Sequence, residues 1–228
     1  MNVSAIIVTR GDVDLGDIVA SLPSEWELLV WDNGARVVHG RPRSATLWMV
    51  EDDLSVYGRY AAIEYASHDL IYVQDDDCVV SDPELIVSEW LRVGRYPWDG
   101  RPAGDAWGND PRDVLDHVVC NMPEAFRARH FYDDHSLVGF GAAFHRSAPQ
   151  RVFDHFTHGH PWHPTEGEFF CRTCDIPFTF FSPCVLVDVE YVDMPWASAD
   201  NRMWKQPDHQ ESRNRMLELC KEVRDAGH

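Results

Sequence analysis

The N-terminal part of the chain alternates short apolar runs with stretches of helical periodicity, and this alternation constrains the fold more than any other feature. Three unbroken apolar runs have the length of buried strands: residues 5–8, 28–31 and 70–73. Between them, apolar residues recur at helical spacing over 15–22, before Pro23, and over 55–68, where Ser55 is expected to cap the helix. Strands that alternate with helices build a mostly parallel sheet with helices on its faces. We therefore predict an α/β fold.

The rest of the chain adds further elements to this prediction. Two more segments are expected as strands: residues 45–50 and 176–192. Residues 82–84 mark a helix start, residues 94–112 lack a clear period and predict a long loop, and residues 137–144 form an apolar segment punctuated by glycines. A capping box over 208–211 predicts a last helix. Its expected apolar stripe consists of Met216, Leu217, Cys220 and Val223.

The charge of the chain disfavours several classes of partner. The 228 residues include 38 Asp and Glu against 20 Lys and Arg, which gives a formal net charge of −18. Such a charge repels phosphate backbones and anionic lipids, so we expect neither a broad nucleic-acid surface nor membrane binding. The segment from Met1 to Val8 has no basic region and is too short for a signal peptide or a membrane span, so a cytoplasmic location is expected. The length favours a single domain.

The six cysteines are expected to be reduced thiols, because a chain of this size folds without disulfides. The spacing of one cysteine pair offers an alternative to free thiols, namely a zinc site. Cys171 and Cys174 follow four histidines, and two thiolates with two imidazoles complete a tetrahedral zinc site. A single CxxC is a weak signal, so zinc is the less favoured interpretation. The histidines are His155, His158, His160 and His163.

Three consecutive carboxylates, which we call the aspartate triplet, follow the apolar run 70–73 and Gln74: Asp75, Asp76 and Asp77. In an open α/β sheet, ligands bind beyond the carboxyl ends of the strands, where these side chains fall. Adjacent carboxylates repel one another unless a cation or a ligand compensates, and hard oxygen ligands suit Mn²⁺ or Mg²⁺. A solvated acidic turn is the simpler alternative, but the strand before the triplet and the helix start after it favour a site.

A metal ion with few protein ligands completes its coordination shell with phosphate oxygens, so the triplet predicts a nucleoside diphosphate or triphosphate as ligand. The sequence contains neither a GxxxxGK[ST] loop nor a GxGxxG motif. Phosphate binding by a P-loop or by a dinucleotide-binding loop therefore has no support.

Short motifs surround the triplet in a defined order: Val8-Thr9-Arg10, Trp31-Asp32-Asn33, Gly58-Arg59-Tyr60, the triplet, Val138–Phe144 and His209-x-x-x-Arg213. This order resembles the exostosin-type glycosyltransferase family of the GT-A class, over about residues 3–220. The resemblance implies one GT-A (Rossmann-like) domain over 1–228, with a nucleotide-binding half at about 1–80 and an acceptor-binding half at about 81–228. Two positions depart from the family pattern, because Asp32 and Gly58 each stand where the family has Asn.

The resemblance also implies roles for single residues. Those that would contact the uridine and its phosphates are Thr9, Arg10, Asp32 and Asn33. Arg59 would lie beside the nucleotide, while Asp75 and Asp76 would face the ribose and the donor sugar. The implied metal ligands are Asp77, Asp75 and His209. The loop that would bring the backbone close to the sugars, which requires small residues, contains Gly139, Gly141 and Ala142.

Three residues are candidates for the chemistry itself: Glu166, Glu168 and Arg213. Glu166 and Glu168 lie where the family has its sugar-orienting carboxylate, and only one is expected to face the site, with Glu166 preferred. His209 lies at a predicted helix start, where the helix dipole favours the neutral imidazole. Arg213, one turn later, would contact the same diphosphate and stabilise the leaving UDP.

These observations predict a glycosyltransferase that depends on Mn²⁺ or Mg²⁺ and moves a hexose or N-acetylhexosamine from a UDP-sugar donor to a hydroxyl acceptor. Retention of anomeric configuration is implied by the resemblance alone. The acceptor is open, with a glycan or a modified polymer such as DNA as candidates. One alternative is a metal-dependent phosphohydrolase or nucleotidyltransferase, which needs a second carboxylate cluster. The other is a non-catalytic carbohydrate-binding protein that uses the nine tryptophans.

An anionic acceptor would need cations near the site. Arginines occur in two places along the chain, although ordinary solvated side chains are the simpler interpretation. They are Arg36, Arg41 and Arg43, and then Arg127, Arg129, Arg146 and Arg151.

Overall fold

The computed structural model describes residues 2–34, 46–49, 53–95, 117–124, 136–150, 152, 176–200, 202 and 205–225. Its strands are β1 (Val3–Thr9), β2 (Glu27–Asp32), β3 (Thr46–Met49), β4 (Leu70–Asp75), β5 (Cys78–Val80), β6 (Val118–Asn121), β7 (Ala142–His145), β8 (Cys184–Val187) and β9 (Tyr191–Asp193). Its helices are α1 (Gly16–Ala20), η1 (Ser55–Tyr57), α2 (Gly58–Ala61), η2 (Ala62–Tyr65), α3 (Pro83–Arg95), α6 (Ile176–Phe181) and α7 (His209–Asp225).

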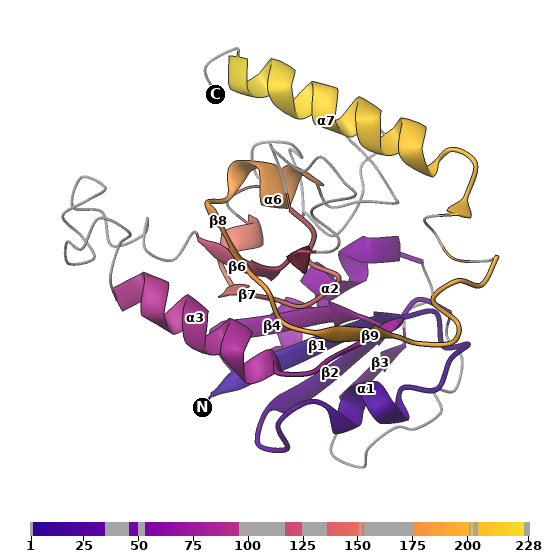
Figure 1. Ribbon diagram of the computed structural model, residues 1–228, viewed down its shortest axis with the longest axis vertical. Helices are drawn as coiled ribbons and strands as arrows, with labels where there is room; N and C mark the ends of the chain where they lie inside the picture. The colour runs from indigo at the N-terminus through magenta and orange to yellow at the C-terminus, as the bar shows by residue number, and fades with distance from the viewer. Residues whose placement is uncertain are drawn as a thin grey trace.

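Seven of the strands form one mixed sheet in the order β3-β2-β1-β4-β7-β6-β8 (Figure 1). The four N-terminal strands pair in parallel, β7 is antiparallel to both β4 and β6, and β8 is parallel to β6. The remaining two strands, β5 and β9, form a separate antiparallel pair. The predicted α/β fold with a mostly parallel sheet is therefore confirmed.

The two faces of the sheet are covered by different helices, because successive side chains of a strand point to opposite faces. Ile6 and Ile71 belong to the apolar cluster that contains the η1–α2–η2 segment and Phe178 of α6. Ile7 and Tyr72 belong to the cluster that contains residues of α1 and α3. The described helices thus lie on both sides of the sheet, as Figure 1 shows.

The segment predicted as one helix over 55–68 is instead three short helices that end at Tyr65. Ser55 lies in the first of them with a φ of 55°, and no side-chain cap bond forms at its start. The turn is held from outside by Asn33, whose side-chain oxygen accepts a hydrogen bond from the Leu54 amide and whose amide group donates to the Ser55 carbonyl. A tertiary contact therefore overrides the local capping signal.

The prediction of buried strands over 176–192 is wrong for its first part, which forms α6. Pro177 lies in the first turn of this helix, where its missing N–H has no intrahelical partner to lose. The two strands that follow, β8 and β9, are partly exposed. Strand β6 was not predicted, and α3 continues through Gly94, where the sequence suggested the start of a loop.

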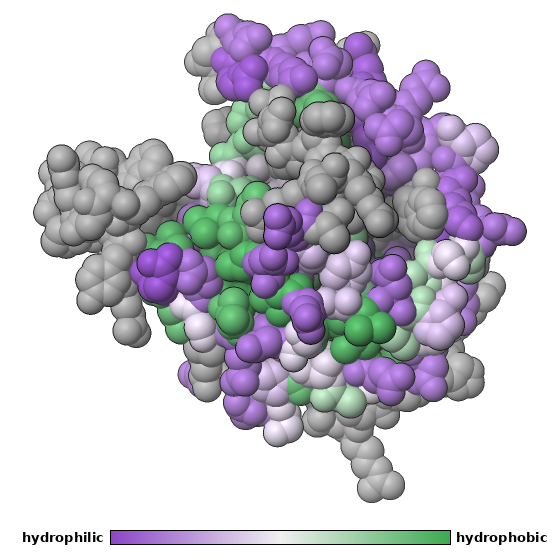
Figure 2. Space-filling view, viewed as in Figure 1, coloured by the Kyte–Doolittle hydropathy of each residue, from purple (hydrophilic) through white to green (hydrophobic). Residues whose placement is uncertain are grey.

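The predicted last helix is confirmed as α7, and part of its apolar stripe packs on α6. Ile176 of α6 forms a small buried cluster with Met216 and Cys220 of α7. The face of α7 visible in Figure 2 is largely hydrophilic, as expected of a helix that buries only one stripe. Among the described residues, no helix has the length and apolar character needed to cross a membrane.

Candidate functional site

The polar strand ends singled out in the sequence lie at one edge of the sheet. Strand register places Asp75 beside Val8 of β1, and Thr9 of β1 beside Asp32 of β2. The backbone amide of Asn33 donates to the Thr9 carbonyl at 2.8 Å, which continues this edge beyond the strands. The predicted convergence of β1, β2 and β4 on the aspartate triplet is therefore observed.

Asp75 is held by a buried arginine and bordered by a glycine. The Arg59 guanidinium, whose side chain is 4% exposed, contacts an Asp75 carboxylate oxygen at 2.7 Å, while Arg59 Nε donates to the Val56 carbonyl. The Asp75 side chain is itself 41% exposed. A Cβ atom on Gly139 would lie 2.2 Å from Asp75 Oδ2, so only glycine permits this approach.

Asp76 is buried and paired with an arginine from much later in the chain. Arg202 Nη1 donates to Asp76 Oδ1 at 3.0 Å, and both side chains are 9% exposed. Asp76 Oδ2 has no hydrogen-bond partner among the described residues. Burial raises the pKa of Asp76, whereas Arg202 and the Thr9 hydroxyl act in the opposite direction.

Asp77 is the member of the triplet whose charge is least compensated. Within the described part of the chain, no basic side chain forms an ion pair with it. Burial, followed by repulsion from Asp75 and Asp76, raises the pKa of Asp77 to about 7, and Asp193 of β9 adds to the repulsion. Arg202 acts in the opposite direction without cancelling these effects.

Asp75 and Asp77 are the carboxylates of the triplet that could contact a divalent cation, which stays a prediction. Two of the three carboxylates are paired with arginines, and Asp77 has no ion pair among the described residues, although Arg202 partly compensates its charge. Among the described residues, no group of three or more His, Cys, Asp or Glu side chains is arranged to hold a metal ion. The predicted trio Asp77, Asp75 and His209 is thus not assembled as a metal site, and a cation at Asp75 and Asp77 would need oxygens from a ligand.

Asp32 and Asn33 have different surroundings at the end of β2. Asp32 is fully buried, its Oδ1 accepts from the Gly34 amide, and its Oδ2 has no partner among the described residues. The Asn33 side chain is used within the protein, because its oxygen also accepts from Trp31 Nε1. The departure at Gly58 has a steric reason, since a Cβ there would lie 2.2 Å from the Trp31 ring.

The predicted sugar loop divides into one residue at the site and two in the core. Gly139 borders Asp75, as described above, and its carbonyl accepts from the Asp75 amide at 2.8 Å. Gly141 has a φ of 102°, and a Cβ there would lie 2.9 Å from both Tyr72 Oη and Ile86 Cδ1. Ala142 is fully buried in β7.

Arg10, a predicted contact of the nucleotide, is exposed just beyond the end of β1.

His209 and Arg213 lie at the start of α7. In Figure 1 this helix starts on the side of the molecule to which β1 runs, and Arg202 precedes His209 by seven residues. His209 is half-buried, and its Nδ1 has no partner among the described residues. Burial, followed by the neighbouring Arg213, lowers the pKa of His209, which favours the neutral imidazole.

Three residues around the triplet were missed by the sequence analysis: Trp196, Asp193 and Arg202. Trp196 Nε1 donates to the Asp76 carbonyl at 2.7 Å, and Arg202 Nε donates to the Trp196 carbonyl at 3.1 Å. Asp193 pairs with Cys78 in the β5–β9 ribbon. No local motif distinguishes these residues, because their partners lie more than a hundred residues earlier in the chain.

Several predicted residues lie outside the described residues, and their roles stay predictions. They are Glu166 and Glu168, the cysteine pair Cys171 and Cys174 with its four histidines, and the arginines Arg36, Arg41, Arg43, Arg127, Arg129 and Arg151. The four cysteines within the described part of the chain are free thiols, as expected: Cys78, Cys120, Cys184 and Cys220.

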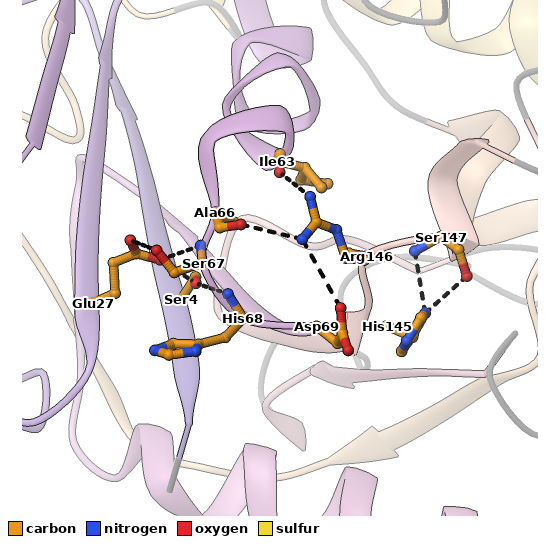
Figure 3. A network of polar contacts seen from close by, with 10 residues as sticks. All are labelled: Ser4, Glu27, Ile63, Ala66, Ser67, His68, Asp69, His145, Arg146 and Ser147. Atoms are coloured by element: carbon orange, nitrogen blue, oxygen red, sulfur yellow. Dashed lines mark hydrogen bonds and ion pairs between the residues drawn. The ribbon is translucent and has the colours of Figure 1, made fainter.

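Arg146 has a structural role at the opposite edge of the sheet (Figure 3). Its guanidinium donates to the Ala66 and Ile63 carbonyls, each at 3.1 Å, and lies 3.9 Å from Asp69 just before β4. This arginine ties the η2–β4 connection to the end of β7, far from the triplet at the other end of β4.

No family model and no curated protein matches the chain. Among solved structures, fragment 1–349 of S. aureus TarS in complex with UDP-GlcNAc aligns with 54% of this chain and 35% of its own length, at 12% identity and a TM-score of 0.34. The chain thus spans about a third of that structure. Another structure of the same fragment aligns with 96% of this chain and 70% of its own length, at 9% identity and a TM-score of 0.48.

Two further solved structures come from other bacteria. The glycosyltransferase GlyE of Streptococcus pneumoniae TIGR4 aligns with 95% of this chain and 51% of its own length, at 8% identity and a TM-score of 0.40. HddC from Yersinia pseudotuberculosis aligns with 97% of this chain and 99% of its own length, at 9% identity and a TM-score of 0.40. The fold described above rests on strand order and register, and the exostosin-type family stays a prediction.

Proposed function

We propose that this protein is a glycosyltransferase that binds a UDP-sugar and a divalent cation at the carboxyl ends of β1, β2 and β4. The observation that carries the proposal is the aspartate triplet, in which two carboxylates are paired with Arg59 and Arg202 while Asp77 is left uncompensated. A cation bound by Asp75 and Asp77 would be completed by diphosphate oxygens. That requirement for a diphosphate favours a nucleotide-sugar donor.

The uridine preference is supported by the end of β2. Asp32 Oδ2 is a buried acceptor without a partner among the described residues, at the same edge of the sheet as the triplet. A buried carboxylate oxygen is stabilised by an N–H donor, and uracil offers one at N3 whereas adenine offers a ring acceptor at its pairing edge. Asp32 would therefore suit uracil better than adenine, whereas a preference over guanine, which also has a ring N–H, rests on the resemblance alone; the family pattern has Asn at this position.

The proposed chemistry places each residue in a defined role. When bound, the cation would neutralise the diphosphate and assist departure of UDP. Arg59 holds Asp75 in place, and Gly139 leaves room for the Asp75 carboxylate, beside which the donor sugar would lie. Arg213 would donate to the leaving diphosphate from α7. The carboxylate that orients the sugar would be Glu166 or Glu168, and the acceptor hydroxyl would attack with retention, as in the exostosin-type family.

The test is a calorimetric titration of UDP, ADP and GDP into the protein with Mn²⁺ and with EDTA. We expect UDP to bind in Mn²⁺ at least about tenfold more tightly than in EDTA and more tightly than either purine nucleotide. Equal affinity with and without the cation would refute the metal assignment, and a purine preference would refute the uridine assignment. Incubation with UDP-sugars tests the reaction, because release of phosphate or pyrophosphate instead of UDP would indicate a phosphohydrolase or nucleotidyltransferase.

A further inference from the structure

We propose that Arg202 is a positioning residue for the aspartate triplet, which commits Asp76 to an internal ion pair and leaves Asp75 and Asp77 to the cation. This inference rests on the proposed function. It assigns a specific role to the 194–202 segment, which no motif indicated, and it removes Asp76 from the residues that face the donor sugar.

Three hydrogen bonds close a ring between the triplet and this later segment. Arg202 Nη1 donates to Asp76 Oδ1 at 3.0 Å, Arg202 Nε donates to the Trp196 carbonyl at 3.1 Å, and Trp196 Nε1 donates to the Asp76 carbonyl at 2.7 Å. The amide of Met194 also donates to the Asp77 carbonyl at 2.8 Å. The segment therefore fixes both the backbone and one side chain of the triplet, across 126 residues of sequence.

The Arg202–Asp76 pair affects cation binding because Asp76 lies between Asp75 and Asp77, the two proposed cation ligands, in the sequence. A carboxylate that is 9% exposed needs a partner, and breaking such a buried pair leaves an uncompensated charge. Without Arg202, Asp76 would be a third carboxylate available to a cation bound by Asp75 and Asp77. Asp76 would then fill a coordination position that a diphosphate oxygen would otherwise take.

The variant Arg202→Met is expected to change two affinities in opposite directions. Mn²⁺ alone should bind more tightly, by about threefold or more, because Asp76 loses its partner and becomes a third carboxylate available to the cation. UDP in the presence of Mn²⁺ should bind about tenfold more weakly, because the unpaired Asp76 carboxylate repels the diphosphate and takes a coordination position that a diphosphate oxygen would fill. A purely structural role would weaken both together.

The double variant Asp76→Asn/Arg202→Met tests the pairing itself. It removes one negative and one positive charge, so both affinities should return to within about threefold of the wild type. Arg202→Lys keeps the charge but lacks the Nε donor to Trp196, so it should show the same opposite changes at smaller size. Arg202→Lys also replaces Arg202→Met in the comparison if the latter does not fold.

Arg146→Met is the matched control, because Arg146 also makes an ion pair with an aspartate and two hydrogen bonds with backbone carbonyls (Figure 3). It lies beside the amino end of β4, and residues 70–74 of that strand separate it from Asp75, the first member of the triplet. The variant is expected to lower the melting temperature and to leave both affinities unchanged.

The measurements are electron paramagnetic resonance of free Mn²⁺ for the metal alone and calorimetry for UDP in Mn²⁺. Opposite changes in Arg202→Met that the double variant reverses would support the inference. Unchanged affinities, parallel losses of both, or a double variant that stays like Arg202→Met would overturn it while leaving the proposed function intact. A wild-type protein that binds neither Mn²⁺ nor UDP would overturn the proposed function, and the inference with it.

Discussion

The aspartate triplet consists of three residues of the same type that lie in three different environments. Asp75 is partly exposed and paired with Arg59, Asp76 is buried and paired with Arg202, and Asp77 has no ion pair within the described part of the chain. Because each carboxylate has a different partner, each should respond differently to substitution. A negative charge on Asp77 destabilises the ligand-free protein, whereas the proposed binding of a cation requires that charge.

Asp77→Asn is expected to separate stability from binding. Removal of the uncompensated charge should raise the melting temperature of the metal-free protein at pH 8, since Asp77 is repelled by Asp75, Asp76 and Asp193. The same change should weaken UDP binding in Mn²⁺ by about a hundredfold, because a cation ligand is lost. Thermal denaturation in EDTA and calorimetry with UDP measure the two effects. A variant that is less stable than the wild type and still binds UDP would contradict this role.

At the scale of elements, glycines decide how closely the connections pack against the strand ends. A Cβ atom added at Gly139, in the connection before β7, would clash with the flexible and partly exposed side chain of Asp75. A Cβ atom added at Gly58, the first residue of α2, would clash with the buried ring of Trp31, which cannot move away as easily. The same substitution should therefore have different consequences at the two positions.

Gly139→Ala is expected to reduce binding of UDP in Mn²⁺ by about tenfold while the protein stays folded, because Asp75 moves and its contact with Arg59 is lost. Gly58→Ala should instead lower the free energy of unfolding by about 1–3 kcal/mol, because the overpacked Trp31 cannot relax. Urea denaturation and calorimetry distinguish the two outcomes. If Gly139→Ala binds UDP as the wild type does, Asp75 does not face the ligand.

Helix α7 is attached to the rest of the described structure mainly through α6. Met216, which is 1% exposed, lies at the centre of that contact with Ile176 and Cys220. The position of His209 and Arg213 therefore depends on a small apolar cluster outside the two main clusters of the sheet.

Met216→Ala is expected to destabilise the contact between α6 and α7 by about 2–4 kcal/mol, because a buried side chain is truncated. The loss should appear as faster amide exchange in α7 than in β1 or β4, since local unfolding follows local packing. Glu218→Ala is the control, because Glu218 is exposed and forms only a surface pair with Lys221 at 3.5 Å. Uniform loss of protection in all elements would contradict the local character of this contact.

At the scale of the whole molecule, negative charge dominates. The formal net charge is −18, and the triplet adds a local concentration of carboxylates at one sheet edge. Both features oppose folding more strongly as more carboxylates ionise, since like charges are brought together in the compact state. The dependence of stability on pH should therefore differ from that of a protein whose acids are all well paired.

The contribution of Asp77 to the free energy of unfolding of the metal-free protein is expected to fall as the pH rises between about 4 and 7. The pKa of Asp77 is about 7 in the folded protein against 3.8 ordinarily, so the native state binds more protons in this range and is stabilised by acid. The contribution should reach about 1 kcal/mol per pH unit. The lowered pKa values of His145 and His209, caused by burial, act oppositely below their ordinary value of 6.5.

The contribution of Asp77 is isolated by comparing the wild type with Asp77→Asn, since the histidines are common to both. Urea denaturation in EDTA at about pH 5 and pH 8 should give a smaller loss of stability for the variant. Added Mn²⁺ with UDP should stabilise the wild type at the higher pH by mass action. Identical pH dependences in the two proteins would show that Asp77 titrates at an ordinary pKa.

The sequence by itself determined the elements whose signal is local. The apolar runs at 5–8, 28–31 and 70–73 are strands, the periodic segment after 208 is a helix, and the convergence of the strand ends on Asp75 follows from parallel pairing. Each of these depends on a period or a run of apolar residues that neighbouring positions supply. The local signal failed where a distant side chain intervened, as Asn33 does at Ser55.

Only the tertiary structure decided how the charge of the triplet is distributed. Nothing in three adjacent aspartates distinguishes the one that pairs with Arg59 from the one that pairs with Arg202, because the arginines come from segments on either side of the triplet in the sequence. Side-chain partners depend on which segments are brought together in space, and an ion pair between residues 126 positions apart has no sequence period to reveal it. The division of the triplet into paired and uncompensated carboxylates is therefore a property of the folded chain.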